Sequence, residues 1–116
     1  MVTDIPYDGS DFYCELAIPH PERLDVVHDS ARVLAFHHTR PYWAVHVVVV
    51  PTRHIGSLTS VSAADEADIR ELLGVVQAIA KDVESEYGAA AVLTNLGAYQ
   101  DSKHVHVHVH SGGRLA

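Results

Sequence analysis

The chain has 116 residues and a formal net charge of −7 when its histidines are neutral. This length supports one hydrophobic core, and the acidic balance argues against non-specific nucleic-acid binding through a basic surface. Ten histidines stand out, whereas the single cysteine excludes an intrachain disulfide and a Cys-x-x-Cys zinc site. We therefore expect one domain over residues 1–116, in a reducing compartment such as the cytoplasm.

Residues 1–21 are expected to form an irregular arm, because prolines and a glycine interrupt them repeatedly. Within this arm, residues 12–16 predict a short turn of helix or an edge segment. The N-terminus shows no basic stretch followed by an apolar run, so we expect no signal peptide. The longest apolar run, residues 45–51, is too short to span a bilayer.

Five segments predict β-strands: residues 24–28, 32–37, 45–51, 90–94 and 104–110. The run at 45–51 is almost wholly apolar, which favours a central position covered on both faces.

One long helix is expected to begin near Ser62, whose side chain can cap it, and to stop at Gly88. Its apolar stripe should contain Ile69, Leu72, Leu73, Val76, Ile79, Ala80 and Val83.

The order of strands, one helix and further strands predicts an α+β fold rather than a parallel sheet. The last two strands are close in sequence and should form an antiparallel hairpin. Gly112-Gly113 is expected to end the final strand.

The segment His104 to His110 alternates four histidines with three valines. Side chains alternate across a strand, so all four imidazoles should share one face, with neighbours about 6.6 Å apart. The valines can enter a core, but each imidazole has two ring nitrogens that need partners. Such a row therefore indicates a function beyond packing.

Three interpretations of this histidine row compete: a solvated strand face, a metal site, and nucleophilic catalysis. Imidazole binds zinc, copper and nickel, but this spacing is wide for one ion, so His46 or His54 would have to add a ligand. A neutral imidazole can also attack phosphorus while its neighbours orient it or stabilise charge. Asn95, Gln100 and Ser102 are close enough in sequence to build a polar cradle.

The segment Gln-x-x-x-His-Val-His-Val-His-Val, which begins at Gln100, resembles the motif of the histidine triad (HIT) superfamily, His-φ-His-φ-His-φ-φ with φ apolar. Residues 34–37, a proline-containing loop and residues 46–55 are similar to the family's central strands and its Pro-x-x-His-Ile turn. The long helix and the Asn95-x-Gly97 turn lie where the family has them.

This resemblance implies about five antiparallel strands, one long helix and a short N-terminal helical segment, with two subunits paired as a homodimer. It further implies a cofactor-free, metal-independent hydrolase or transferase acting at the α-phosphate of a purine nucleotide or nucleotide conjugate. The reaction would pass through a covalent nucleotidyl-histidine, as in the nucleoside phosphoramidase and dinucleoside polyphosphate hydrolase branches. No nucleic acid or membrane is expected as a partner.

Residue roles follow by the same resemblance. His106 is expected to be the nucleophile, with His104 and His108 flanking it and His46 supporting the site from the neighbouring strand. Five residues are expected to contact the nucleotide: Asn95, Gln100, Ser102, His38 and Phe36.

The chain departs from the family pattern near the triad. His110 replaces an apolar residue, so the triad could be 104/106/108 or 106/108/110, and the position of Gln100 favours the first register. The loop over residues 95–100 is shorter than usual, and Ser102 is shifted by one place.

Two further departures concern ligands. His38 stands where the family has a ribose-contacting acid, which keeps open a second function: a HIT-fold protein that binds a nucleotide or a metal with little hydrolysis. Cys14 falls where some members carry part of a zinc site, but its partner cysteine is missing, so we expect no structural zinc.

Overall fold

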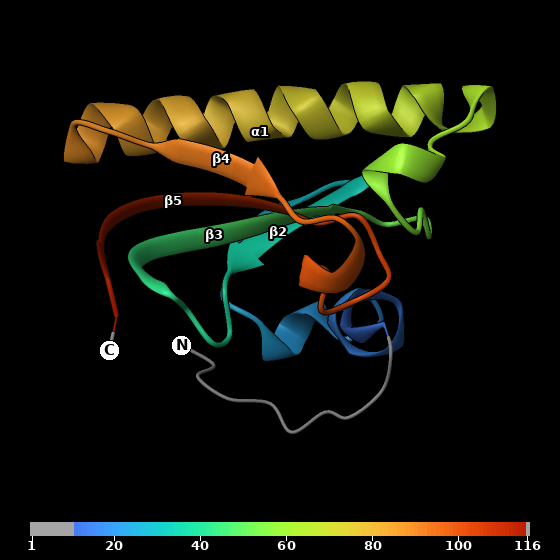
Figure 1. The fold of residues 1–116 in the computed structure, drawn as a ribbon, viewed down its shortest axis with the longest axis horizontal. Coiled ribbons are helices and arrows are strands. Elements are labelled where there is room, and N and C mark those ends of the chain that lie inside the picture. The colour runs from blue at the N-terminus through green and yellow to red at the C-terminus, as the bar shows by residue number, and fades with distance from the viewer. Residues whose placement is uncertain (1–10, 116) are drawn as a thin grey trace.

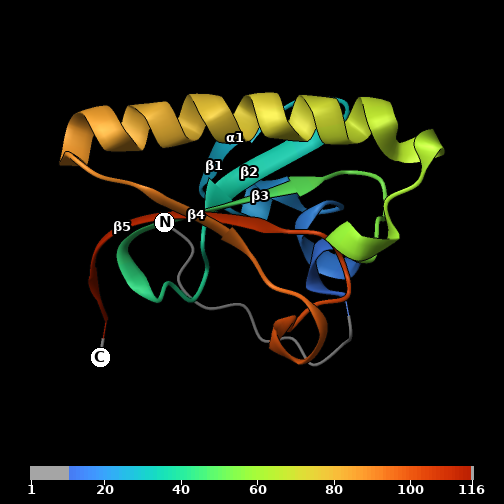
Figure 2. The ribbon, with the colours of Figure 1, turned by 45° about the horizontal axis from the view of Figure 1, so that its top comes forward.

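The computed structural model describes residues 11–115 and shows one antiparallel sheet with the strand order β1-β2-β3-β5-β4. The strands are β1 (Val26–Asp29), β2 (Val33–His37), β3 (Trp43–Pro51), β4 (Ala91–Thr94) and β5 (Val107–Arg114). The helix α1 (Glu66–Tyr87) covers one face of the sheet, as Figures 1 and 2 show. The predicted α+β fold, with five antiparallel strands and one long helix, is confirmed.

Short helical turns complete the chain, and two of them precede β1 on the side of the sheet away from α1 (Figure 1). The turns are η1 (Tyr13–Ala17), η2 (Pro21–Arg23), η3 (Leu58–Ser60), η4 (Ala63–Asp65) and η5 (Gly97–Tyr99). The turn η1 supplies the short N-terminal helical segment that the sequence led us to expect.

Two hydrophobic clusters lie on the two faces of the sheet. Between the sheet and α1, alternate residues of β2, β3 and β5 pack on buried helix residues, among them Val47, Val109 and Leu72. On the opposite face, Phe36 and Val48 pack on Tyr13 of η1 and its neighbours. Strand β3 therefore contributes to both clusters, as its apolar run predicts.

The helix follows its prediction closely, with one error. A capping box joins Ser62 to Asp65 ahead of the first α-helical turn, and Gly88, at φ +86°, ends the helix. Leu73 was expected in the apolar stripe but is 56% exposed, and Val75 is buried instead. Successive helix residues are about 100° apart, so Leu73 points away from the face centred on Leu72. No helix within residues 11–115 combines the length and apolar character needed to cross a membrane.

Strand β5 differs from its predicted bounds at both ends. His104 and His106 precede the regular ladder, which begins at Val107, and the pairing continues through Gly112-Gly113 to Arg114. The prediction that these glycines end the strand is wrong. The register with β3 shifts between Trp43 and Val45, and Gly112 has φ +82° opposite this bulge. Glycine is suited to this irregular pairing because it tolerates a positive φ.

The alternation predicted for the histidine row is confirmed. Val105, Val107 and Val109 pack in the cluster beneath α1. The imidazoles lie on the other face, beside η1 and the loop between β2 and β3. The sheet thus separates the helix-covered core from a face lined with polar rings.

Candidate active site

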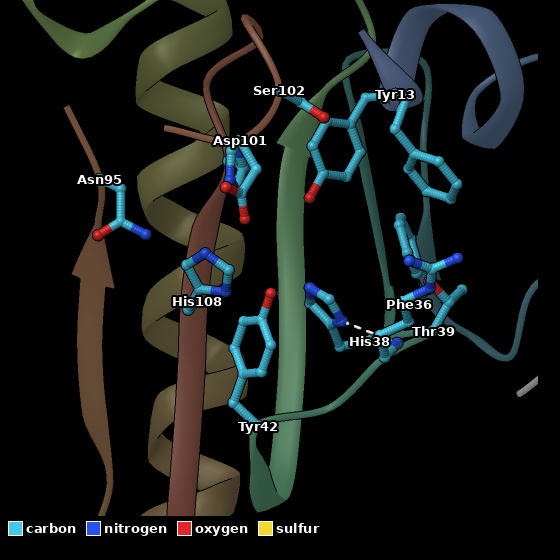
Figure 3. A pocket seen from close by; sticks show the side chains of 12 residues that line it. Tyr13, Phe36, His38, Thr39, Tyr42, Asn95, Asp101, Ser102 and His108 are labelled. Atoms are coloured by element: carbon cyan, nitrogen blue, oxygen red, sulfur yellow. Dashed lines mark hydrogen bonds between the residues drawn. The ribbon is translucent and has the colours of Figure 1, made fainter. Parts of the chain in front are cut away.

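A pocket of about 260 Å³ opens on the face of the sheet away from α1 (Figure 3). It lies between β5, the β2–β3 loop and the start of the described chain. Of the nine residues expected in the site, the structure places six around it: His106, His108, His38, Phe36, Asn95 and Ser102. His104, His46 and Gln100 lie behind these residues rather than in the pocket wall.

His106 is held in one tautomer by the main chain. Its Nδ1 lies 2.7 Å from the carbonyl oxygen of His104. A carbonyl only accepts hydrogen bonds, so Nδ1 donates and carries the proton, which leaves the lone pair of the neutral ring on Nε2. Burial lowers the pKa of His106, and the ring is therefore neutral near pH 7. Its Nε2 therefore offers a lone pair and no proton.

His108 is oriented by a relay that begins at the backbone. The Tyr42 N–H donates to His46 Nδ1 at 3.0 Å, so the proton of the neutral His46 ring is on Nε2. That Nε2 lies 2.8 Å from His108 Nδ1 and donates to it. The proton of His108 is consequently on its own Nε2.

The Nε2 of His108 is the last atom of this relay. Among the buried side-chain nitrogen and oxygen atoms of residues 11–115, it is the one with no hydrogen-bond partner. Burial lowers the pKa of His46 and of His108 to about 3 each, so both rings stay neutral at physiological pH. A buried N–H beside a pocket is costly unless a ligand accepts from it.

His38 closes the pocket on the side of β2 and stacks on His46 with ring centroids 4.3 Å apart. Its Nδ1 accepts the N–H of Arg40 at 3.0 Å, drawn as a dashed line in Figure 3, so its proton is on Nε2. Burial lowers the pKa of His38 to about 4. The pocket therefore presents a neutral donor at the position where the family resemblance led us to look for an acid.

The opposite side of the pocket is built from Asn95, at the end of β4, and from Asp101 and Ser102 ahead of β5 (Figure 3). Strand β4 is tied to the triad, because Thr94 Oγ1 donates to the carbonyl oxygen of His106 at 2.8 Å. Gln100 supports this loop from behind, where its Nε2 donates to the carbonyl oxygen of Gly56 at 2.7 Å.

His104 and His110 differ from His106 and His108, the two histidines of the row that line the pocket. His104 is fully buried, its Nε2 donates to the Pro51 carbonyl oxygen at 2.8 Å, and its own carbonyl holds His106. His110 lies away from the pocket and stacks on Trp43 with centroids 3.6 Å apart. This geometry favours the 104/106/108 register.

Sequence reasoning missed six pocket residues: Phe12, Tyr13, Thr39, Arg40, Tyr42 and Asp101. The loop over residues 38–42 could have been predicted to line the site, because it follows His38 directly and joins two predicted strands. Phe12 and Tyr13 belong to a short turn with no periodic pattern. Burial raises the pKa of Tyr13, so its hydroxyl stays protonated.

Comparisons with known proteins agree with this fold. The HIT domain family model matches residues 22–114. An uncharacterized HIT-like protein of Azospirillum brasilense is 30% identical over 115 residues, which cover 94% of this chain and 91% of that protein. A second HIT-like protein, from Synechococcus elongatus, is 32% identical over 93 residues, which cover 79% and 82% of the two chains.

Solved structures superpose over most of the chain. A histidine triad protein of Clostridium difficile is 26% identical, with a TM-score of 0.73 and coverage of 96% of this chain and 97% of that one. A HIT family hydrolase of Legionella pneumophila is 20% identical, with a TM-score of 0.76 and coverage of 91% and 96%. A HIT family hydrolase of Clostridium thermocellum is also 20% identical, with a TM-score of 0.77 and coverage of 92% and 94%. The two hydrolases show a shared fold.

Proposed function

Because the chain belongs to the HIT family, we propose that it hydrolyses or transfers a purine nucleotide conjugate at the α-phosphate through a covalent nucleotidyl-histidine. One observation carries the proposal. The pocket brings together a lone pair on His106 Nε2 and an N–H on His108 Nε2 that has no hydrogen-bond partner among residues 11–115. The first suits attack on phosphorus, and the second suits a phosphoryl oxygen.

In the first step, His106 Nε2 attacks phosphorus, an N–P bond forms, and the bond to the leaving group breaks. The leaving group takes up a proton from solvent as it departs. The ring of His106 then carries a positive charge while its Nδ1–H remains bonded to the His104 carbonyl. In the second step water attacks phosphorus, a P–O bond forms and the N–P bond breaks. The electron pair returns to Nε2 of His106, a proton passes to solvent, and the nucleotide leaves the neutral ring.

His108 contributes an oriented donor for the charge that develops on the phosphoryl oxygens. The relay from the Tyr42 N–H through His46 fixes its tautomer before substrate arrives. A donor held in place in a buried site stabilises developing charge without reorganisation of solvent.

The other residues that line the pocket suit the binding of a nucleotide with an aromatic base. Phe12, Phe36 and Tyr42 supply apolar and aromatic surface, and Asn95 and Ser102 supply polar groups on the side of the triad. Aromatic side chains stack on a purine, and amide and hydroxyl donors bind phosphate oxygens.

A second candidate function is a binding protein with little hydrolytic activity. His38 favours it, because the ring replaces an expected acceptor with a donor, and its ligand nitrogen lies within 4.8 Å of those of His46 and His108. Calorimetry with AMP and, separately, with zinc distinguishes the two functions. Tight zinc binding without nucleotide affinity would favour this candidate.

The direct test compares the wild type with His106→Asn in the hydrolysis of an adenosine phosphoramidate. We expect kcat/KM to fall on the order of 10³-fold or more, because the nucleophile is removed while the pocket wall remains. His110→Asn is the matched control, since His110 lies outside the pocket. Equal turnover by wild type and His106→Asn would exclude His106 as the nucleophile.

A further inference from the structure

The proposed reaction does not use the carboxylate of the pocket, that of Asp101. Of the described residues that line the pocket, Asp101 alone is acidic. Figure 3 shows its side chain between those of Asn95 and Ser102, across the pocket from Phe36. A negative charge beside a site for a phosphoryl group is unfavourable unless it also faces something positive. The position of Asp101 therefore bears on which substrates the pocket accepts.

The carboxylate of Asp101 is not neutralised by its neighbours. The nearest cation in sequence is Lys103, whose Nζ donates to the carbonyl oxygens of Gly97 and Gln100 at 3.3 and 3.2 Å. Asp101 takes part in none of the ion pairs formed within residues 11–115. Its negative charge is therefore available to a ligand.

The charge of Asp101 also acts on the rings at the centre of the pocket. Burial lowers the pKa of His106 and lowers that of His38 to about 4, and the Asp101 carboxylate opposes this lowering in both rings. Burial raises the pKa of the Tyr13 hydroxyl, and Asp101 adds to that rise. A nearby negative charge favours protonation of an imidazole and of a phenol alike. Asp101 is thus close enough to influence a charged group bound beside His106.

The layout of the pocket places Asp101 near the leaving group rather than near the base. The aromatic residues Phe12 and Phe36, which suit a base, belong to the side formed by the N-terminal turn and β2. His108 lies between that side and Asn95, and Asp101 lies beside His108, away from Phe36 (Figure 3). A conjugate with its base against the aromatic rings and its α-phosphate at the triad would extend its remaining part toward Asp101.

A leaving group that becomes positively charged suits this carboxylate, and an anionic one does not. Where the leaving group is joined to phosphorus through nitrogen, the P–N bond breaks and the electron pair stays on nitrogen. Protons from solvent then convert the departing group to an amine and to its ammonium ion, whose charge Asp101 would stabilise. A phosphate leaving group would bring further negative charge to the same place, where the carboxylate repels it.

We propose, on the basis of the proposed reaction, that Asp101 is a specificity-determining residue that selects an amine over a phosphate chain as the leaving group. Phosphoramidates with a positively charged amine are then the preferred nucleotide conjugates. The same carboxylate stabilises the positive charge that His106 gains when its N–P bond forms, and it does so for either leaving group. Asp101 therefore affects the rate with both classes of substrate, but only its contact with the leaving group makes the two rates differ.

The test is the ratio of kcat/KM for two substrates whose leaving groups have opposite charge. One is AMP joined through a P–N bond to ethylenediamine, and the other is diadenosine tetraphosphate. We expect the wild type to favour the first by at least about tenfold, and Asp101→Asn to reduce this ratio by about tenfold. Asp101→Lys should reduce it further. Because Asp101 is exposed, added salt should also reduce the wild-type ratio.

Asp82→Asn is the matched control, because it removes one negative charge from α1, on the other face of the sheet. This variant should keep the wild-type ratio, and circular dichroism shows whether each variant folds. The same ratio in the wild type and Asp101→Asn would overturn the proposal, as would a wild type that does not favour the amine conjugate. An equal change in Asp82→Asn would overturn it too, since net charge alone would then explain the effect.

A binding measurement separates a failure of this proposal from a failure of the proposed function. ADP carries its second phosphate where the leaving group would lie, whereas AMP ends at the α-phosphate. In calorimetry, Asp101→Asn should gain roughly 3- to 10-fold more affinity for ADP than for AMP. Equal gains would refute the role of Asp101. Absence of turnover of both substrates by the wild type would instead refute the proposed reaction, and absence of binding of both nucleotides would refute both proposals.

Discussion

The four histidines of the terminal row differ in what their ring nitrogens contact. The ring of His106 is held by a carbonyl, that of His108 by another imidazole, and that of His104 by the Pro51 carbonyl. His110 stacks on Trp43 instead. These partners fix which ring nitrogen of each histidine carries the proton. They therefore decide which ring can donate a hydrogen bond into the pocket and which can offer a lone pair.

His46 should matter for catalysis although it does not line the pocket. His46→Ala removes the donor to His108 Nδ1, so the His108 ring is free to change tautomer and lose its oriented Nε2–H. We expect kcat/KM to fall by about 10- to 100-fold, less than for His106→Asn. Steady-state hydrolysis of an adenosine phosphoramidate measures this effect. His37→Ala, at the exposed end of β2, serves as the control, and unchanged kinetics in His46→Ala would contradict the relay.

The buried imidazoles should also make the free energy of unfolding depend on pH. Burial lowers the pKa of His46 and His108 to about 3, below the usual value near 6.5 in an unfolded chain. Between these values the unfolded chain binds protons that the folded chain does not, so stability falls as pH falls from about 6.5. The neighbouring rings, His38, His106 and His110, shift in the same direction.

Each fully unprotonated ring contributes a slope of about 1.4 kcal/mol per pH unit within that range. Urea unfolding at about pH 7 and about pH 5 measures the loss. His46→Gln should flatten the dependence, because one titrating ring is gone. Equal stability of the wild type at both pH values would show that these rings are not buried in their neutral form.

At the scale of elements, the periodic patterns predicted which faces are buried better than they predicted where each element ends. The alternation of histidine and valine predicted the two faces of β5, and the helical period predicted the buried side of α1. The end of β5 was predicted wrongly because a glycine pair signals a turn or a bulge equally well, and only the pairing with β3 distinguishes them. The turn that carries Tyr13 has no period, so its place in the pocket could not be predicted.

Gly112 should be sensitive to the addition of a single methyl group. Its φ is +82°, and an added Cβ would lie 2.9 Å from the Cβ of Ala44. We expect Gly112→Ala to lower the free energy of unfolding by about 1–3 kcal/mol. In the neighbouring control, Gly113→Ala, an added Cβ would meet nothing within 4 Å, so the effect should be smaller. Equal urea midpoints for the two variants would contradict the bulge.

At the scale of the whole molecule, the two faces of the sheet differ: one packs against α1, and the other carries a smaller hydrophobic cluster beside the pocket. The larger cluster lies between the sheet and α1, and the pocket lies on the other face. The homodimer implied by resemblance stays a prediction. Strand β4 forms one edge of the sheet and exposes half of the Val92 surface, so it is where we expect a second copy to pair. Sedimentation analysis tests this expectation.

Two adjacent leucines on α1 lie in different environments, one in the core and the other at the surface. Leu72 is 2% exposed in the cluster under the helix, whereas Leu73 is 56% exposed. Leu72→Ala should lower the free energy of unfolding by about 2–4 kcal/mol through lost burial and a residual cavity. Leu73→Ala should change it by less than about 0.5 kcal/mol. Urea unfolding compares the pair, and similar losses in both variants would place the helix in a different rotation.

The relay to His108 begins at the N–H of Tyr42, and His106, the proposed nucleophile, is held by the carbonyl of His104. Both fixed points are main-chain groups, which every residue carries, except that proline lacks the N–H. Position 42 can therefore hold almost any amino acid without loss of the hydrogen bond from its N–H to His46 Nδ1. In a saturation library at this position only proline should abolish the relay. Most substitutions of Tyr42 should therefore leave the orientation of the His46 and His108 rings unchanged.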